Sequence, residues 1–159
     1  MALRDQINDS LKEAMKSGDK RRVSTLRLVN SALKNADIEA RGQAKEPLSD
    51  DDLLSLLQKM IKQRQESLEI YEKAGRTDLA TQEREEIAII AGYLPKQMDE
   101  HEITHVVGEM LKELGAQSMK DMGRAMAHLK ERFAGKMDFA HASAVVKRLL
   151  SSVTPHKGG

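Results

Sequence analysis

The stretch from Lys59 to Met98 constrains the fold more than any other part of the chain. It carries two runs of apolar residues at helical spacing, on either side of the turn Ala74-Gly75-Arg76-Thr77. Gly75 suits the left-handed residue that ends many helices, and Leu94-Pro95 ends the second run because proline disfavours helical geometry before it. The apolar faces contain Leu53, Leu57, Met60, Leu68 and Tyr71 in the first run, which begins near Asp50, and Leu79, Ile87, Ile90 and Leu94 in the second. This pattern predicts a helical hairpin.

Charged side chains fall inside both of these apolar faces. At about 100° per residue, Arg64 projects among the apolar residues of the first helix, and Glu83 and Glu86 project among those of the second. A buried guanidinium needs a partner, because an uncompensated buried charge costs several kcal/mol. We therefore expect Arg64 to pair with Glu86, with Glu83 or with both, as an ion pair that sets the register of the hairpin. The functional alternative is a polar pocket formed by these residues and Tyr71.

Two further helices precede the hairpin, over residues 3–16 and 20–41. The second has a wide apolar side that we expect to be buried: Leu26, Leu28, Val29, Ala32, Leu33 and Ala36. Its opposite side carries basic residues at steps of seven, near Asn30 and Ser31: Lys20, Arg27, Lys34 and Arg41. This basic stripe is either a solvated face or a track for phosphate groups.

The region from Pro95 to Asp99 is the best candidate for a domain boundary. Three short amphipathic patterns follow it, and we expect Met119, Met122 and Met126 to fill their common core. We find no strand pattern. The sequence predicts an all-α fold with an N-terminal helical domain (residues 1–95), which is a bundle containing the long hairpin. It also predicts a small three-helix C-terminal tail domain (99–153) and a flexible tail (154–159).

Composition limits the chemistry and the setting. The chain has no Cys, which removes disulfides and thiolate sites and is compatible with a reducing cytosol. No apolar run approaches the roughly 20 residues of a membrane helix, and the N-terminus has no apolar signal core. We therefore expect a soluble cytoplasmic protein of bacterial type, without a membrane contact. Residues 116–159 carry eight basic and three acidic side chains, a local excess that permits an anionic partner.

One motif invites a metal assignment that we do not make. His101-Glu102-Ile103-Thr104-His105 matches the HExxH pattern of zinc proteases. The helical wheel points both histidines away from the apolar face, and the match begins at the start of a helix instead of inside a buried one. No nucleotide loop or catalytic elbow is present either. We expect no catalytic residues, no metal site and no cofactor.

Three blocks of the sequence resemble one known family. The block KQRQESLEIYEKAGRTDLATQEREEIAIIAGYLPKQM strongly resembles the central signature of the GatB/YqeY family. The N-terminal DSLKEAMKSGDKRRVSTLRLVNSALKNADIE is similar to the start of YqeY-like proteins. The C-terminal DMGRAMAHLKERFAGKMDFAHASAVVKRLL is similar to the tail that these proteins share with the GatB subunit of the tRNA-dependent amidotransferase. That tail commonly reads GKAD, where this chain has Gly135-Lys136-Met137-Asp138.

The resemblance implies an all-helical fold and the family label of carbon–nitrogen ligase with glutamine as amido-N-donor. In GatB the tail helps to hold tRNA, and the chemical steps take place elsewhere, so we expect no catalysis by this chain alone. We predict a protein that binds tRNA or assists an enzyme that charges or amidates tRNA. The alternative is a non-catalytic adaptor between proteins. The predicted backbone contacts are Lys120, Arg124, Lys130, Arg132, Lys136, Lys147 and Arg148, with Lys20, Arg27, Lys34 and Arg41 as a second track.

Overall fold

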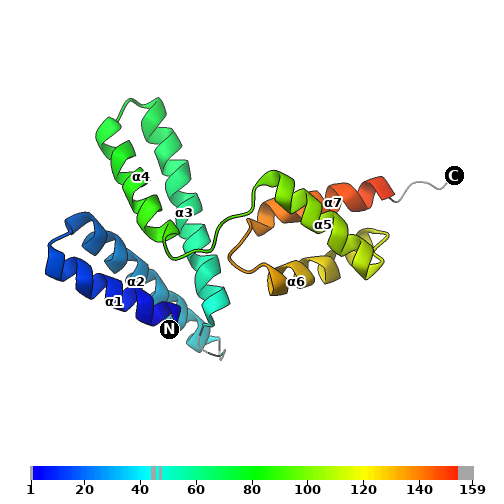
Figure 1. Cartoon of the computed structure of the whole chain (residues 1–159), viewed down its shortest axis with the longest axis horizontal. Coiled ribbons are helices and arrows are strands. Elements are labelled where there is room, and N and C mark those ends of the chain that lie inside the picture. The colour runs from blue at the N-terminus through cyan, green and yellow to red at the C-terminus, as the bar shows by residue number, and fades with distance from the viewer. Residues whose placement is uncertain (1, 44–45, 47, 154–159) are drawn as a thin grey trace. The chain divides into compact units, whose positions relative to one another are not determined.

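A computed structural model describes residues 2–43, 46 and 48–153, with side chains as far as Ser151 (Figure 1). The predicted tail over residues 154–159 lies outside the described residues. Within them the chain has seven α-helices and no strand, which confirms the all-α class. The helices are α1 (Leu3–Ser17), α2 (Lys20–Gly42), α3 (Asp50–Lys73), α4 (Thr77–Ala91), α5 (Glu100–Leu114), α6 (Met122–Arg132) and α7 (Phe139–Val153), with a 3-10 turn η1 (Met119–Asp121).

Contacts divide the chain into two compact units, Met1–Pro95 and Lys96–Gly159. None of the helices that the structure describes is long and apolar enough to cross a bilayer.

The first unit is built from two pairs of neighbouring helices (Figure 1). The α1–α2 connection and the α3–α4 connection each contain a glycine with positive φ, at Gly18 (74°) and Gly75 (71°). L-residues rarely adopt this backbone conformation, so glycine ends both helices at low cost. At the other end of α3, Ser49 and Asp52 form a reciprocal capping box. The buried core consists of Leu3, Ile7, Leu26, Val29, Leu33, Leu53, Leu57, Met60 and Ile90.

The buried face of α2 differs from the predicted one at two neighbouring turns. Leu28, which we expected to be buried, is 47% exposed, whereas Thr25 is fully buried. The predicted apolar face of α2 was too wide. A surface helix buries only a stripe of its circumference, and Leu28 lies at the edge of the apolar face, outside that stripe. Hydrogen bonds from Arg21 to Glu85 (2.9 Å) and from Arg22 to the Tyr93 hydroxyl (3.1 Å) join α2 to the α4 region.

The second unit packs α5, α6 and α7 around one core. The methionine side chains of this unit lie in positions that differ from the predicted ones. Met119 is 44% exposed because the chain forms the turn η1 before α6 begins at Met122, and Met122 and Met126 only line the edge of the core. The fully buried methionine is Met137, in the loop between α6 and α7.

One backbone hydrogen bond and one from a side chain tie this loop to the first residues of the unit. The Met98 amide donates to the Lys136 carbonyl at 2.7 Å, and Gln97 Nε2 donates to the Gly135 carbonyl at 2.6 Å. Gly135 has φ 76°, which turns the chain and directs Met137 into the core. Lys136 lies between these anchored residues with an exposed side chain.

We expect Met137→Ala to destabilise the protein by roughly 2–4 kcal/mol, because it removes a fully buried side chain and leaves a cavity. Met119→Ala is the matched control and should change stability by no more than about 0.5 kcal/mol, since surface substitutions have small effects. Urea unfolding, followed by circular dichroism, measures both. Equal effects of the two substitutions would contradict the placement of Met137.

Candidate nucleic-acid interface

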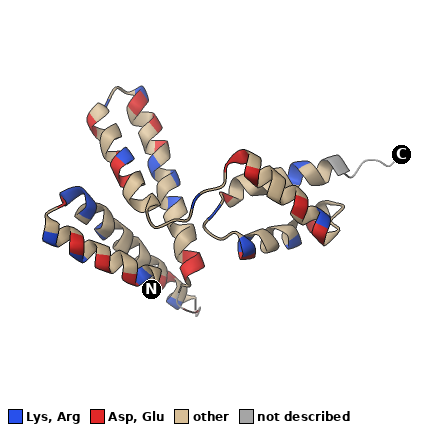
Figure 2. Ribbon diagram, in the orientation of Figure 1, with Lys and Arg blue, Asp and Glu red and all other residues tan. Residues whose placement is uncertain are grey.

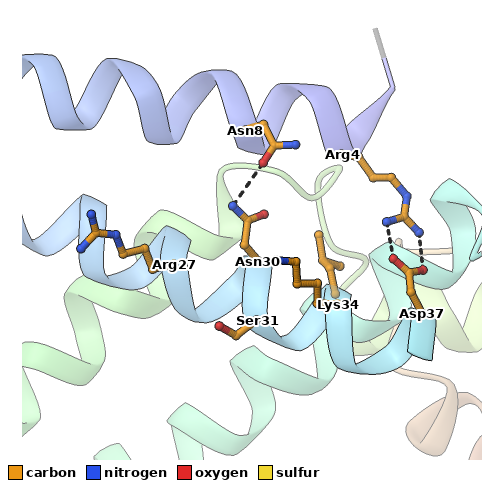
Figure 3. Close-up of a pocket in the computed structure, with 8 residues that line it drawn as sticks. Arg4, Asn8, Arg27, Asn30, Ser31, Lys34 and Asp37 are labelled. Atoms are coloured by element: carbon orange, nitrogen blue, oxygen red, sulfur yellow. Dashed lines mark hydrogen bonds and ion pairs between the residues drawn. The ribbon is translucent and has the colours of Figure 1, made fainter. Parts of the chain in front are cut away.

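An open groove of about 590 Å³ lies along the α1–α2 pair of the first unit (Figure 3). Its floor includes the buried side chain of Leu33, and its other lining residues are polar or charged. They are Arg4 and Asn8 from α1, and Arg27, Asn30, Ser31, Lys34 and Asp37 from α2.

Helical spacing explains why these residues meet. Arg4 and Asn8 are four residues apart and therefore share one side of α1. On α2, Arg27, Asn30 and Lys34 follow each other at steps of three and four, which places them on one side as well. Ile7 on α1 and Leu33 on α2 are buried in the core, so the polar residues beside them lie at the rim of the helix contact.

A bidentate ion pair joins α1 and α2 at one end of the groove. Arg4 donates to Asp37 through two nitrogens, at 2.7 Å and 2.6 Å (Figure 3). The hydrogen bonds from Arg4 hold the pKa of the Asp37 carboxyl below its ordinary value, with further contributions from the Leu48 amide and the charge of Arg41. Asp37 therefore stays ionised, and Arg4 offsets its charge.

A pair of amide side chains crosses the groove further along. Asn30 Nδ2 donates to Asn8 Oδ1 at 3.2 Å, and the two side chains point toward one another from α2 and α1 (Figure 3). Together with the Arg4–Asp37 pair, this contact fixes the separation of the two helices at two places.

The structure gathers only the middle of the predicted basic stripe at the groove. Arg27 and Lys34 line it, both are exposed, and neither has an acidic partner among the described residues. Lys20 and Arg41 are exposed but do not line it. The groove thus holds three cations against the single carboxylate of Asp37.

Our sequence reasoning missed the contribution of α1. Arg4 and Asn8 sit beside the apolar positions of that helix at a spacing of four, and this signal could have been read from the sequence. The partners of Arg4 and Asn8 on α2 could not be predicted from the sequence, because the pairing depends on how the two helices are aligned.

The seven predicted cations of the second unit are all exposed, and Figure 2 shows where Lys and Arg residues lie along its helices. Two of them are engaged: Arg124 pairs with Asp121 at 2.9 Å, and Arg132 pairs with Glu113 at 3.2 Å and lies 5.7 Å from the ring centre of Phe133. In the described part of the chain no acidic side chain pairs with the other five, Lys120, Lys130, Lys136, Lys147 and Arg148. Arg132 lines one hollow of this unit, of about 200 Å³, together with His105, Glu109 and Glu113.

Arg64 lies inside the α3–α4 interface and contacts Glu86. Arg64 Nε is 3.2 Å from Glu86 Oε1, and the two side chains are 16% and 6% exposed. Gln82 donates to the other Glu86 oxygen at 3.2 Å, and Arg64 also donates to the Met60 carbonyl. The groups of this pair thus have hydrogen-bond partners on both helices, as buried charges require.

Glu83 shares this layer without a hydrogen bond to Arg64. Its Oε2 atom is buried and has no hydrogen-bond partner among the described residues. Burial raises the pKa of the Glu83 carboxyl, and the neighbouring charge of Glu86 raises it further, while Arg64 acts in the opposite direction. One guanidinium therefore faces two carboxylates, and Glu86 holds it.

The HExxH residues have a local structural role. Glu102 and Asp99 form a reciprocal capping box at the start of α5, with hydrogen bonds of 3.2 Å and 2.8 Å. His101 and His105 are exposed on this helix. Among the described residues, no three His, Asp or Glu side chains are grouped to hold a metal ion.

Comparison with known proteins decides the family. The model of the family described as "Yqey-like protein" matches residues 4–150. The chain belongs to this family. A relative from Lachancea thermotolerans, "Altered inheritance of mitochondria protein 41, mitochondrial", is 37% identical over 68% of this chain and 57% of its own length. A relative of the same name from Pyrenophora tritici-repentis is 33% identical over 80% of this chain and 71% of its own length.

A third relative, "Uncharacterized protein C22F3.15" from Schizosaccharomyces pombe, is 35% identical over 57% of this chain and 70% of its own length. The chain spans little more than half of the Lachancea relative, at 57%. Neither the family description nor these names mentions a ligand.

The relatives contradict two predictions. We expected a bacterial and cytoplasmic protein, but the matched relatives are fungal, and those from Lachancea and Pyrenophora are named as mitochondrial. Both predictions are therefore wrong by this comparison. They rested on the absence of Cys and of a signal sequence, which does not distinguish one reducing compartment from another.

We expect Arg64→Ala to destabilise the protein by roughly 2–4 kcal/mol, because it leaves the Glu86 carboxylate buried without its countercharge. Arg84→Ala is the control, since Arg84 pairs with Glu72 at the exposed edge of the same two helices and should cost less than about 1 kcal/mol. Chemical unfolding at neutral pH measures the difference. An Arg64→Ala variant as stable as Arg84→Ala would contradict a structural role for the pair.

Glu83 predicts a pH dependence of stability. Because its folded pKa lies above the ordinary value of 4.5, the stability that it contributes is present below that value and is lost as the pH rises through the folded pKa. Glu83→Gln stays neutral, so we expect this variant to gain stability relative to the parent chain as the pH rises above 4.5. Urea unfolding at a series of pH values from 4.5 upward, with Glu66→Gln at an exposed position without an ion pair among the described residues as control, tests the sign. If the stability of Glu83→Gln relative to the parent chain increased as the pH fell, the predicted pH dependence would be refuted.

Proposed function

We propose that this protein is a non-catalytic RNA-binding accessory protein that holds the phosphate backbone of tRNA. The observation that carries the proposal is the α1–α2 groove, in which Arg27 and Lys34 are exposed without acidic partners beside neutral hydrogen-bonding side chains. A cation that already forms an ion pair must give up its partner before it can bind phosphate. Arg27 and Lys34 can bind phosphate without this cost.

The spacing of the two cations suits a polymer of phosphates. Seven residues of α-helix rise about 10 Å, so Arg27 and Lys34 can contact different phosphates of one strand. Because the groove is open along α2, a strand can enter and leave at its ends. Lys20 and Arg41 extend the same side of the helix by another two turns in each direction.

The second unit supports the proposal with a second set of cations. Its five exposed cations without acidic partners come from η1, α6, the α6–α7 loop and α7 (Figure 2). The resemblance of this unit to the tail of the GatB subunit is consistent with RNA as the polyanion. Phosphate contacts of this kind position a nucleic acid without reading its sequence. The role that we propose is therefore to hold tRNA and not to select one tRNA by its bases.

We expect Arg27→Glu/Lys34→Glu to weaken binding to bulk tRNA by at least about tenfold at low salt, because two contacts to phosphate become repulsive. The slope of log affinity against log salt should fall by about 2, one unit for each lost cation. Fluorescence anisotropy of labelled bacterial and mitochondrial tRNA, across a salt series, measures both quantities.

Lys59→Glu/Lys112→Glu is the matched control, because it makes the same change in net charge at exposed positions outside the groove. Lys130→Glu/Lys136→Glu measures the share of the second unit. Equal losses for the groove variant and the control would show attraction by net charge alone and would contradict the groove. Absence of tRNA binding at low salt would contradict the whole proposal and favour a protein adaptor.

A further inference from the structure

The amide pair in the groove keeps one donor and one acceptor for a ligand. Asn30 Nδ2 donates to Asn8 Oδ1. Within the described part of the chain, Asn8 Nδ2 and Asn30 Oδ1 make no further hydrogen bond. An amide nitrogen can only donate and an amide oxygen can only accept. The groove therefore presents a donor and an acceptor side by side.

The amide pair lies between the two phosphate-binding cations. On α2, Asn30 follows Arg27 by three residues and precedes Lys34 by four, and the three side chains line the same groove (Figure 3). In a nucleic acid strand, a sugar lies between successive phosphates. If Arg27 and Lys34 hold phosphates, the intervening sugars pass across Asn30 and Asn8.

A hydroxyl group is the chemical match for this arrangement. It can donate to Asn30 Oδ1 and accept from Asn8 Nδ2 at the same time. Phosphates are the same in RNA and DNA, so the cations of the groove cannot tell the two apart. The 2′-hydroxyl of ribose, which is both donor and acceptor, is the group that lets a protein do so.

We propose that Asn8 and Asn30 bind the ribose 2′-hydroxyl, so that the groove selects RNA over DNA. This inference rests on the proposed function, since the cations must first bring the strand into the groove. The Arg4–Asp37 ion pair acts as a positioning element: Arg4 is one turn from Asn8 on α1, and its two hydrogen bonds to Asp37 hold that helix at a fixed distance from α2.

The test compares three single-stranded oligonucleotides of one uracil-containing sequence, with ribose, 2′-deoxyribose or 2′-O-methylribose. The full chain should bind the ribose form about three- to tenfold more tightly than the deoxy form, which corresponds to the usual strength of one or two hydrogen bonds. The 2′-O-methyl form keeps the sugar shape of RNA and loses the donor. It should therefore bind as the deoxy form does.

The variant Asn8→Ala/Asn30→Ala should lose the preference for ribose, so that the ribose and deoxy forms bind with equal affinity. Asn35→Ala removes an exposed amide from the same helix outside the groove and should keep the preference. Because the ligand series uses the unaltered protein, the inference stays testable even if the double variant unfolds.

The outcomes separate this inference from the proposed function. Equal binding of the three oligonucleotides would overturn the inference and leave RNA binding standing. Tight binding of the 2′-O-methyl form together with weak binding of the deoxy form would show selection by sugar shape and would also overturn it. Absence of binding to all three would overturn the proposed function and the inference together.

Discussion

The contact between Arg64 and Glu86 lies within the interface on which the first unit depends. Aliphatic contacts between two helices are not directional, so they constrain the register of the helices less than a charge pair does. A charge pair inside the interface holds the register, since a shift of one turn separates the charges and leaves both desolvated. In the aligned hairpin, Glu85 accepts a hydrogen bond from Arg21 of α2, and the Tyr93 hydroxyl accepts one from Arg22. The orientation of α2, and with it the side that carries the groove, follows from this alignment.

Glu83 explains why this layer is more than a simple pair. A second carboxylate in the same half-buried space opposes the first, so the layer is least strained when Glu83 carries a proton. Gln82 offers Glu86 a neutral hydrogen bond and adds no further charge. We therefore expect this interface to gain specificity of register at some cost in stability. Buried ionic groups in other proteins show the same compromise.

Much of the fold could be predicted from the sequence, because periodicity and turn residues are local signals. Gly75 and the spacing of Leu53, Leu57 and Met60 are sufficient to place a buried helix next to a turn. The failures concern residues whose burial depends on distant partners. Thr25 is buried and Leu28 is exposed because the buried stripe of α2 is narrower than its apolar face, and Met137 is buried because Gly135 turns its loop inward. The same holds for the candidate groove. The basic stripe with Arg27 and Lys34 could be predicted from the spacing on α2 alone. The polar contacts across the groove could not, because they also need residues of α1.

The hydrogen bonds from Gln97 and Met98 to the loop at Gly135 and Lys136 have a consequence for how the second unit can be inherited. They tie the first residues of that unit to the loop before its last helix, and every group involved belongs to the unit itself. These two hydrogen bonds need no residue of the first unit. We therefore expect that a unit closed in this way can be joined to different N-terminal neighbours during evolution.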